Sequence, residues 1–461
     1  MSGKWHLGLR TDLAPCSRGF ARNFSFLPGA GNHFNYEPQL DSDGPLLPFI
    51  WTDGFWMEGE EHIDRKTQLP ADFYSTTSFT DRLLDYLAEH ESDPTCSEQP
   101  FFAYLPFTAP HWPLQAPKET REKYKGRYDE GPTALRENRL RRMAELGIIS
   151  ADVKPAPVVG LKGREWEDLD ASERAISARK METYAAMVDE IDKGIGRILD
   201  HLQASGRLDN TMILFMSDNG AEGKLLEAIP MMGSSTNLGQ IVNRFYNNSL
   251  DNIGNFDSFT WYGPRWACAA TAPSRGFKTW ITEGGIRCPC IVRYPSSLKA
   301  PPAAISNAFT TVMDIFPTVL DLAGVPHPPS QFRGRVVAPI RGKSWLSHLR
   351  SEAVVTDKVG VGQQPTIVLP GEIHDPSTTF TGWELFGSCA IRRGDWKAAH
   401  QPPPRGKGDW ELYNVGKDPG ELEDLAETKP EILKGLITDW EQYYAETGMF
   451  DTKTEFNVIK G

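Results

Sequence analysis

Met212-Ile-Leu-Phe-Met-Ser-Asp-Asn-Gly220 is the stretch that decides the fold class of this chain. Its first five residues are apolar and predict a buried strand, after which polar residues follow at once. Residues 172–205 precede it and repeat apolar side chains at positions i, i+3 and i+4, which predicts a long helix ended by Ser205-Gly206. A helix that leads directly into a buried strand is typical of an α/β domain.

Further segments extend this pattern in both directions. Upstream, one face of a predicted helix holds four apolar residues, Phe79, Leu83, Leu84 and Leu87. Phe101–Leu105 predicts a buried strand, which Pro106 ends. Downstream, two aromatic-rich stretches at 383–396 and 410–415 and a helix near 430–446 predict a small sheet capped by a helix.

Three less regular segments separate these elements. Residues 118–170 are charge-rich, and their closely spaced arginines favour a solvated helical surface over an anion site; these are Arg136, Arg139, Arg141 and Arg142. Residues 230–262 predict a long ordered loop of the kind that borders a site, with aromatic residues that could flank a substrate or simply pack. Residues 355–378 are polar and contain Gly and Pro, so we expect two domains, 1–355 and 356–461.

Composition excludes several classes of protein. The net charge of −12 argues against a nucleic-acid partner, because phosphate contacts need a basic face. An anionic substrate must therefore be attracted by a local cluster of cations. No apolar run is long enough to span a membrane, and the first residues lack a secretory leader, which favours a cytoplasmic protein.

Six widely spread cysteines are expected to be reduced and mostly buried thiols. Cys288-Pro-Cys290 is too tightly spaced for the usual zinc site and has no second pair.

Asp218 and Asn219 are the first candidate functional residues, because ligands gather beyond the carboxyl ends of strands in α/β sheets. A carboxylate beside an amide carbonyl supplies hard oxygen ligands, which suit Ca²⁺ and also Mg²⁺. Asp-Asn-Gly is equally a common turn, and two residues are too few for a full metal shell.

Lys4, His6, His111 and Lys278 are the other candidates. Two lysines and two histidines could bind a tetrahedral oxyanion and move protons near neutral pH. Each residue alone could equally be an exposed lysine or a histidine that satisfies a loop carbonyl. Spacing along the chain does not show that the four converge.

Several motifs, in this order, resemble those of the sulfatase family and are most similar to the bacterial arylsulfatases. The four that contain the candidates are Gly3-Lys-Trp-His-Leu-Gly8, Pro100-Phe-Phe-Ala-Tyr-Leu-Pro-Phe-Thr-Ala-Pro-His-Trp-Pro-Leu114, Phe215-Met-Ser-Asp-Asn-Gly-Ala-Glu-Gly223 and Phe277-Lys-Thr-Trp-Ile-Thr-Glu-Gly-Gly-Ile-Arg287. The resemblance extends over essentially the whole chain, through Trp383-Glu-Leu-Phe386 and Arg393-Gly-Asp-Trp-Lys397. It implies an alkaline-phosphatase-like α/β fold, in which a mixed sheet is flanked by helices, and a smaller C-terminal domain with an antiparallel sheet and a helix.

The resemblance also implies a chemistry, the hydrolysis of small organic sulfate monoesters. In this family a cysteine in Cys-x-Pro-Ser-Arg becomes a formylglycine, whose hydrate attacks the sulfate sulfur, and a metal polarises the sulfate oxygens. Asp218 and Asn219 would ligate calcium. Lys4 would stabilise the formylglycine and sulfate, and His6 would act as a base. His111 and Lys278 would hold the sulfate and assist the leaving oxygen.

The sequence departs from the family at its nucleophile. The family's nucleophile motif lies upstream of Gly3-Lys-Trp-His-Leu-Gly8, and no Cys-x-Pro-Ser-Arg occurs in this chain. Cys16 has the wrong spacing, and Thr271 cannot yield an aldehyde, so neither substitutes for it. We therefore expect no sulfatase activity and poor solubility, because the loss would uncover apolar surface and strand edges.

Two alternatives remain open at this stage. One is a non-catalytic sulfatase-like fragment or relic, and the other is a phosphate or phosphonate ester hydrolase of the same superfamily. The sequence does not determine the physiological ester or the oligomeric state.

Overall fold

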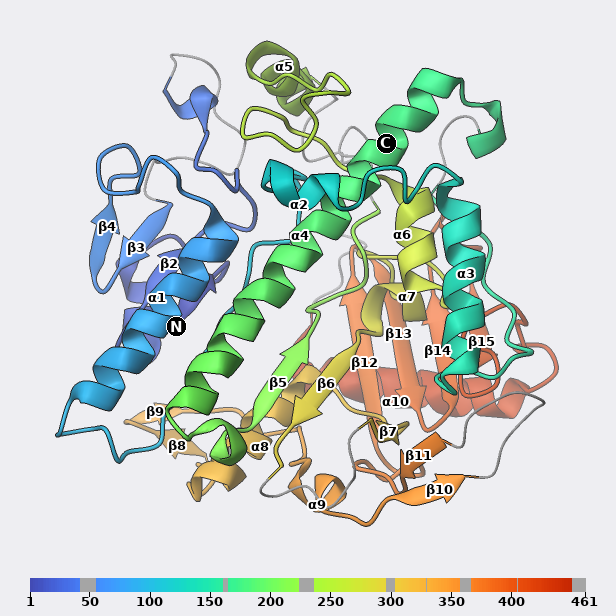
Figure 1. The fold of residues 1–461 in the computed structure, drawn as a ribbon. Coiled ribbons are helices and arrows are strands. Elements are labelled where there is room, and N and C mark those ends of the chain that lie inside the picture. Colours follow the sequence, from blue (N-terminus) through green and yellow to red (C-terminus); the bar gives the residue numbers. More distant parts are fainter. Residues whose placement is uncertain are drawn as a thin grey trace.

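The computed structural model describes residues 1–41, 55–160, 165–223, 236–295, 303–328, 330–356, 366–403 and 405–449. Helix α4 (Ala171–Ala204) crosses the molecule, with a small N-terminal sheet on one side of it and the C-terminal sheet on the other (Figure 1). A capping box between Asp170 and Glu173 starts this helix, because each side chain accepts a hydrogen bond from the other residue's backbone N–H. The predicted helix at 172–205 is confirmed.

The N-terminal sheet has the order β1-β2-β3-β4 and consists of β1 (Ser2–Lys4), β2 (Phe24–Phe26), β3 (Trp56–Glu58) and β4 (Glu61–Ile63). Strands β1 and β2 are parallel, and the other neighbours are antiparallel. Helix α1 (Ser75–Ser92) packs on this sheet through Phe79, which lies in one core cluster with Phe24 and Trp56. On the predicted face of α1, Phe79, Leu83 and Leu87 are buried and Leu84 is half-buried.

The prediction of a buried strand at Phe101–Leu105 was wrong. The segment is extended, but it is not a strand of any sheet in the described part of the chain, and Phe102 and Tyr104 are 60% and 43% exposed. Backbone N–H groups of β1 bond to it, from Ser2 to the Tyr104 carbonyl and from Lys4 to the Pro106 carbonyl. The apolar run predicted burial on both faces, but burial depends on neighbours that the run itself does not specify.

Strand β5 (Ile213–Met216) confirms the strand after α4 but not its full burial. It pairs antiparallel with β6 (Cys290–Arg293), and Phe215 lies opposite Ile291. These two side chains are 42% and 63% exposed. Within the described residues the two strands form a sheet of their own, so the predicted mixed sheet is present as separate pieces.

The charge-rich surface contains α2 (Lys118–Glu122) and α3 (Gly131–Glu145). Arg141 and Arg142 face solvent as predicted, whereas Arg136 and Arg139 donate hydrogen bonds to the carbonyls of Ala156 and Ala269. The predicted loop at 230–262 contains a helix, α5 (Thr236–Phe245), and its first six residues lie outside the described part. Two further helices follow, α6 (Pro264–Thr271) and α7 (Glu283–Ile286).

Short elements connect this region to the C-terminal part of the chain. They are β7 (Ile305–Ser306), α8 (Ile315–Ala323), β8 (Gln331–Phe332), β9 (Arg335–Val336), α9 (Leu346–Leu349), β10 (Val354–Thr356) and β11 (Thr366–Leu369). Strands β10, β11 and β7 form one sheet, so the predicted connection at 355–378 contains strand β11. Residues 357–365 of that connection lie outside the described part. Turns of 3-10 helix cover Thr11–Leu13, Pro15–Arg18, Pro38–Leu40, Trp166–Asp168, Leu208–Asn210 and Val312–Asp314.

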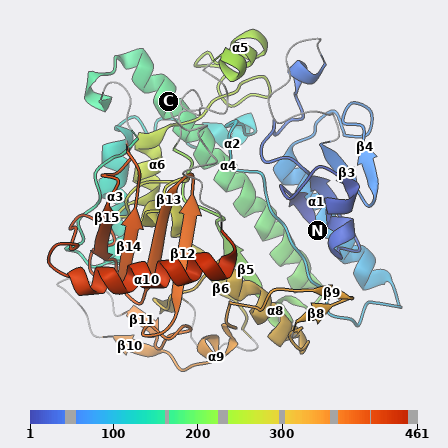
Figure 2. The same cartoon turned by 180° about the vertical axis from the view of Figure 1, so that it is seen from behind.

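The C-terminal sheet is antiparallel and follows chain order, with β12 (Phe380–Leu385), β13 (Ser388–Arg393), β14 (Trp396–His400) and β15 (Trp410–Asn414). Helix α10 (Pro430–Thr447) lies across one face of it (Figure 2). Leu436 and Tyr443 of this helix pack on Ile391, Ala398 and Leu412 of the sheet. The predicted fold class, a mixed α/β protein with a small antiparallel sheet and a helix at its C-terminal end, is confirmed.

All six cysteines lie in described segments, and none forms a disulfide. The prediction that they are mostly buried was wrong, because only Cys268 is buried and Cys290 is exposed. Among the described helices, none combines the length and apolar character that a membrane crossing requires.

Candidate functional site

Lys4 is the last residue of β1, where the strand leaves the N-terminal sheet. Its backbone N–H donates to the Pro106 carbonyl across 2.7 Å, which ties the end of the strand to the segment that leads to His111. Burial lowers the pKa of the Lys4 ammonium, and the positive charge of Lys278 lowers it further, while Asp218 acts in the opposite direction. Lys4 is therefore close enough to Lys278 and Asp218 to respond to both charges.

His6 follows in a backbone conformation that few residues adopt, with a φ of 55°. Its N–H donates to the Leu27 carbonyl, and its imidazole lies directly over Gly29, where a Cβ atom would approach Nε2 to 2.4 Å. Burial lowers the pKa of His6, followed by the charges of Lys4 and Lys278. The imidazole is thus neutral at pH 7 and able to accept a proton.

His111 lies in the loop that follows the extended segment 101–106. Its Nδ1 atom donates to the Trp112 carbonyl across 2.9 Å, because a carbonyl can only accept. This contact leaves the lone pair on Nε2, which faces the Lys278 Nζ atom at 3.1 Å. Burial, then Lys278 and Lys4, hold the pKa of His111 well below its ordinary value.

His33 supports the backbone of His111 and was missed by sequence reasoning. Its Nε2 donates to the His111 carbonyl across 3.0 Å, and its Nδ1 accepts from the Ser75 hydroxyl at 2.9 Å. Burial lowers the pKa of His33 to about 4, so the ring is neutral near pH 7. No motif marks this residue, because its partners come from two distant parts of the chain.

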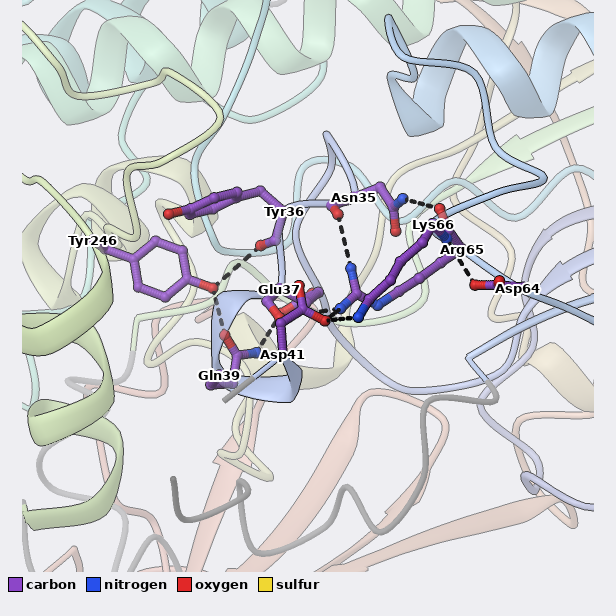
Figure 3. Close-up of polar contacts among 9 residues, drawn as sticks. All are labelled: Asn35, Tyr36, Glu37, Gln39, Asp41, Asp64, Arg65, Lys66 and Tyr246. Carbon is purple, nitrogen blue, oxygen red and sulfur yellow. Dashed lines mark hydrogen bonds and ion pairs between the residues drawn. The ribbon is translucent and has the colours of Figure 1, made fainter. Parts of the chain in front are cut away.

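Polar contacts around the buried Arg65 hold the loop that follows His33, from Asn35 to Asp41 (Figure 3). Arg65 is buried and donates to the carbonyls of Asn35 and Glu37 and to the Asp41 carboxylate. From the other side, Tyr246 donates to the Gln39 side chain across 3.0 Å. The loop is thereby fixed between β4 and the end of α5, and with it the surroundings of His6 and His111.

Lys278 is placed by backbone pairing between two glycine-rich segments. The Lys278 N–H donates to the Ala221 carbonyl, and the Gly220 N–H donates to the Gly285 carbonyl. Gly220 allows this approach, because a Cβ atom there would lie 1.9 Å from the Gly284 carbonyl oxygen. The pairing brings the half-buried carboxylate of Glu222 to 3.2 Å from the Lys278 Nζ atom.

The C-terminal sheet anchors the same loop from behind. Arg405 donates to the carbonyl of Thr279 and lies over the Trp280 ring, 5.1 Å from its centroid. Lys397, fully buried on β14, bonds to Glu283 at 3.0 Å and to Glu421 at 2.9 Å. The position of Lys278 therefore depends on residues that lie more than 100 positions further along the chain.

Asp218 and Asn219 follow β5, and the Asp218 side chain is exposed. The Ser217 hydroxyl donates to the Asn219 carbonyl, which shapes the turn. Their oxygens suit a hard cation, but within the described residues no group of three or more His, Cys, Asp or Glu side chains converges on a metal position. These residues therefore do not complete a calcium shell by themselves.

The structure thus brings together residues that the sequence leaves far apart. The charges of Lys4, Lys278 and Asp218 act on His6, and those of Lys4 and Lys278 act on His111. Sequence reasoning missed Glu222, although it stands in the same motif as Asp218. Acidic residues after a turn are common, so the motif alone did not single it out.

Fold and site together define a mixed α/β protein with a cationic site suited to a tetrahedral anion. The chain belongs to the sulfatase family, whose sequence profile matches residues 1–325. Membership places it among the sulfuric ester hydrolases.

Two relatives show the extent of the likeness. An uncharacterized sulfatase of Schizosaccharomyces pombe is 48% identical over 456 residues, which cover 99% of this chain and 76% of the yeast protein. An arylsulfatase of Klebsiella aerogenes is 33% identical over 348 residues, or 75% of this chain and 68% of that protein.

A solved structure shares the fold. The crystal structure of Ps i-CgsB in complex with k-i-k-neocarrahexaose superposes with a TM-score of 0.59 at 19% identity. The superposition covers 96% of this chain and 71% of that one. At this identity the likeness concerns the fold alone.

Proposed function

We propose that the site binds the sulfate group of a small organic sulfate monoester, as in enzymes of the arylsulfatase type. The contact between Lys278 and His111 carries the proposal, because it sets a charged donor beside a neutral imidazole. The Lys4 ammonium lies close enough to respond to the charge of Lys278, so both lysines can serve one anion. The 33% identity to an arylsulfatase supports the aryl ester as substrate class.

The roles of the side chains follow from their charges. Lys4 and Lys278 bind the sulfate oxygens, because ammonium groups form strong hydrogen bonds with oxyanions. Lys278 donates toward the leaving oxygen of the ester, and the neutral His111 keeps its ammonium directed. In the hydrolysis that the family catalyses, His6, neutral at pH 7, would act as a base.

We further propose Asp218 and Asn219 as two ligands of a Ca²⁺ ion, for which Mg²⁺ is an alternative. A divalent cation there would supply positive charge toward the sulfate oxygens. Since the described residues do not complete the shell, no step of the proposed reaction is assigned to the metal.

The family's nucleophile motif, Cys-x-Pro-Ser-Arg, does not occur in the 461 residues. Cys16 has the wrong spacing to replace its cysteine, and Thr271 cannot yield an aldehyde. We therefore propose that this chain binds sulfate without turning over a sulfate ester.

Titration calorimetry with sodium sulfate at pH 7, with calcium and then with a chelator, tests the binding. We expect saturable binding by the wild type and at least a tenfold loss in Lys278→Ala, because a hydrogen bond to a charged group is worth about 1.5–3 kcal/mol. Lys407→Ala, which changes an exposed lysine between β14 and β15, is the matched control. Absence of sulfate binding in the wild type would contradict the proposal.

Hydrolysis assays decide the remaining parts. With 4-nitrophenyl sulfate we expect no calcium-dependent turnover, and turnover would show that the chain has a nucleophile of its own. Inorganic phosphate, titrated under the same conditions, separates the two ester classes, since stronger binding of phosphate than of sulfate would favour the phosphate or phosphonate alternative.

A further inference from the structure

Lys278 lies between two acceptors of different character. Its Nζ atom is 3.1 Å from His111 Nε2 and 3.2 Å from a carboxylate oxygen of Glu222. The Lys278 side chain is 27% exposed and that of Glu222 is 17% exposed, so solvent screens the pair only in part. His111 is neutral and supplies no counter-charge, which leaves Glu222 as the anion in contact with the ammonium.

The surroundings of Lys278 make this counter-charge necessary. Burial lowers the pKa of Lys4 and the charge of Lys278 lowers it further, so the two ammonium groups lie close enough to interact. The titratable groups that contact Lys278 or respond to its charge are Glu222, His111, Lys4 and His6. Among these described groups, Glu222 is the one whose carboxylate contacts the Lys278 ammonium, at 3.2 Å.

We propose that Glu222 is a positioning residue of the sulfate site, whose carboxylate holds the Lys278 ammonium beside His111. The inference rests on the proposed function, because it concerns the group that binds the sulfate oxygens. Backbone geometry supports it, since the bond from the Lys278 N–H to the Ala221 carbonyl aligns the two segments and puts the neighbouring Glu222 beside the lysine side chain.

Competitive acetylation of the full chain with acetic anhydride, followed by peptide mass spectrometry across pH, measures how readily Lys278 loses its proton. In Glu222→Gln we expect the pH of half-maximal Lys278 acetylation to fall, because the variant removes the carboxylate that contacts the ammonium at 3.2 Å. Glu446→Gln removes an exposed carboxylate that pairs with Arg341 on the far side of the C-terminal sheet, and should leave the Lys278 midpoint unchanged. An unchanged midpoint in Glu222→Gln overturns the proposal.

Glu222→Asp keeps the charge but withdraws it by one methylene group. We expect a downward shift smaller than that of Glu222→Gln, which is a partial rescue that a purely structural role would not give. Thermal unfolding shows whether Glu222→Gln folds. If it does not, the Lys278 acetylation midpoint of Glu222→Asp is compared with that of Glu446→Gln. Equal acetylation midpoints in these two variants overturn the proposal.

Sulfate affinity across pH gives a second readout. Glu222→Gln should lower the pH at which sulfate affinity falls by half, but not in a Lys278→Arg background, where the guanidinium does not titrate. A shift in both backgrounds, or in neither, contradicts an action through Lys278. A wild type that binds no sulfate at any pH contradicts the proposed function instead, and the acetylation result still tests the pairing.

Discussion

The Nζ atom of Lys278 lies 3.1 Å from Nε2 of His111, although 167 residues separate the two along the chain. Because Nδ1 of His111 donates to the Trp112 carbonyl, the lone pair on Nε2 accepts a hydrogen bond from the Lys278 ammonium. The pair therefore carries one positive charge at pH 7 instead of two. The Lys278 ammonium can therefore lie in a partly buried site, because the imidazole that it contacts is uncharged.

The first prediction concerns the protonation of His111. Its pKa lies well below 6.5 because of burial and the charges of Lys278 and Lys4, so its ring signals should not titrate between pH 8 and pH 6. In Lys278→Met the nearest cation is absent, and the midpoint should rise. NMR spectra of protein with ¹³C-labelled histidine rings would measure both, and a wild-type midpoint at 6.5 would contradict the assigned contacts.

The second prediction concerns stability and the buried His33. Its folded-state pKa is about 4 against an ordinary 6.5, so between these values the unfolded chain binds a proton that the native chain does not. Stability from this group is complete above about pH 6.5 and is lost as the pH falls toward 4. From pH 7 to pH 5 the loss should be about 2 kcal/mol.

Urea unfolding at the two pH values measures this loss. The decrease should be smaller in His33→Gln, whose side chain does not titrate. An equal decrease in both proteins would show that other groups cause the acid sensitivity.

The third prediction concerns the buried charges behind the Lys278 loop. Burial works against the charge of Lys397, but the carboxylates of Glu421 and Glu283 more than offset this, and the pKa of Lys397 is raised. Lys397→Met removes the cation that contacts both carboxylates and leaves Glu283 only the more distant Arg392, at 3.9 Å. It should lower the free energy of unfolding by about 3–5 kcal/mol. Lys407→Met, which removes a solvent-exposed ammonium, should cost clearly less in the same urea titration.

The fourth prediction concerns self-association through β5 and β6. Phe215 and Ile291 are paired, exposed and apolar, and the described residues place no third strand beside these two. Ile291→Lys should shift the protein toward monomer in sedimentation velocity experiments, because a charge on an open strand opposes edge pairing. Val336→Lys, at another exposed apolar position on β9, is the control, and an equal effect of both variants would point to net charge as the cause.

Local sequence determined the elements whose stability depends on neighbours along the chain. The helix at 171–204 has its own apolar stripe and capping box, and α10 and the C-terminal strands likewise lie where their patterns indicate. The types of residue that could bind an anion, above all Lys4, His111 and Lys278, were also evident from sequence motifs.

Burial could not be determined in this way. Phe101–Leu105 and Ile213–Met216 have the composition of inner strands, yet Phe102 and Phe215 are exposed. Whether an apolar strand is covered depends on the elements beside it, which come from distant parts of the chain.

The sequence by itself therefore determined which chemical groups this protein has and which helices and strands present them. Only the tertiary structure decided that Lys278 meets His111, that Glu222 becomes its counter-charge and that His33 supports the loop. The physical reason is that charge pairing, desolvation and hydrogen bonding act over a few ångströms in space, whereas the residues involved are separated by tens to hundreds of positions along the chain.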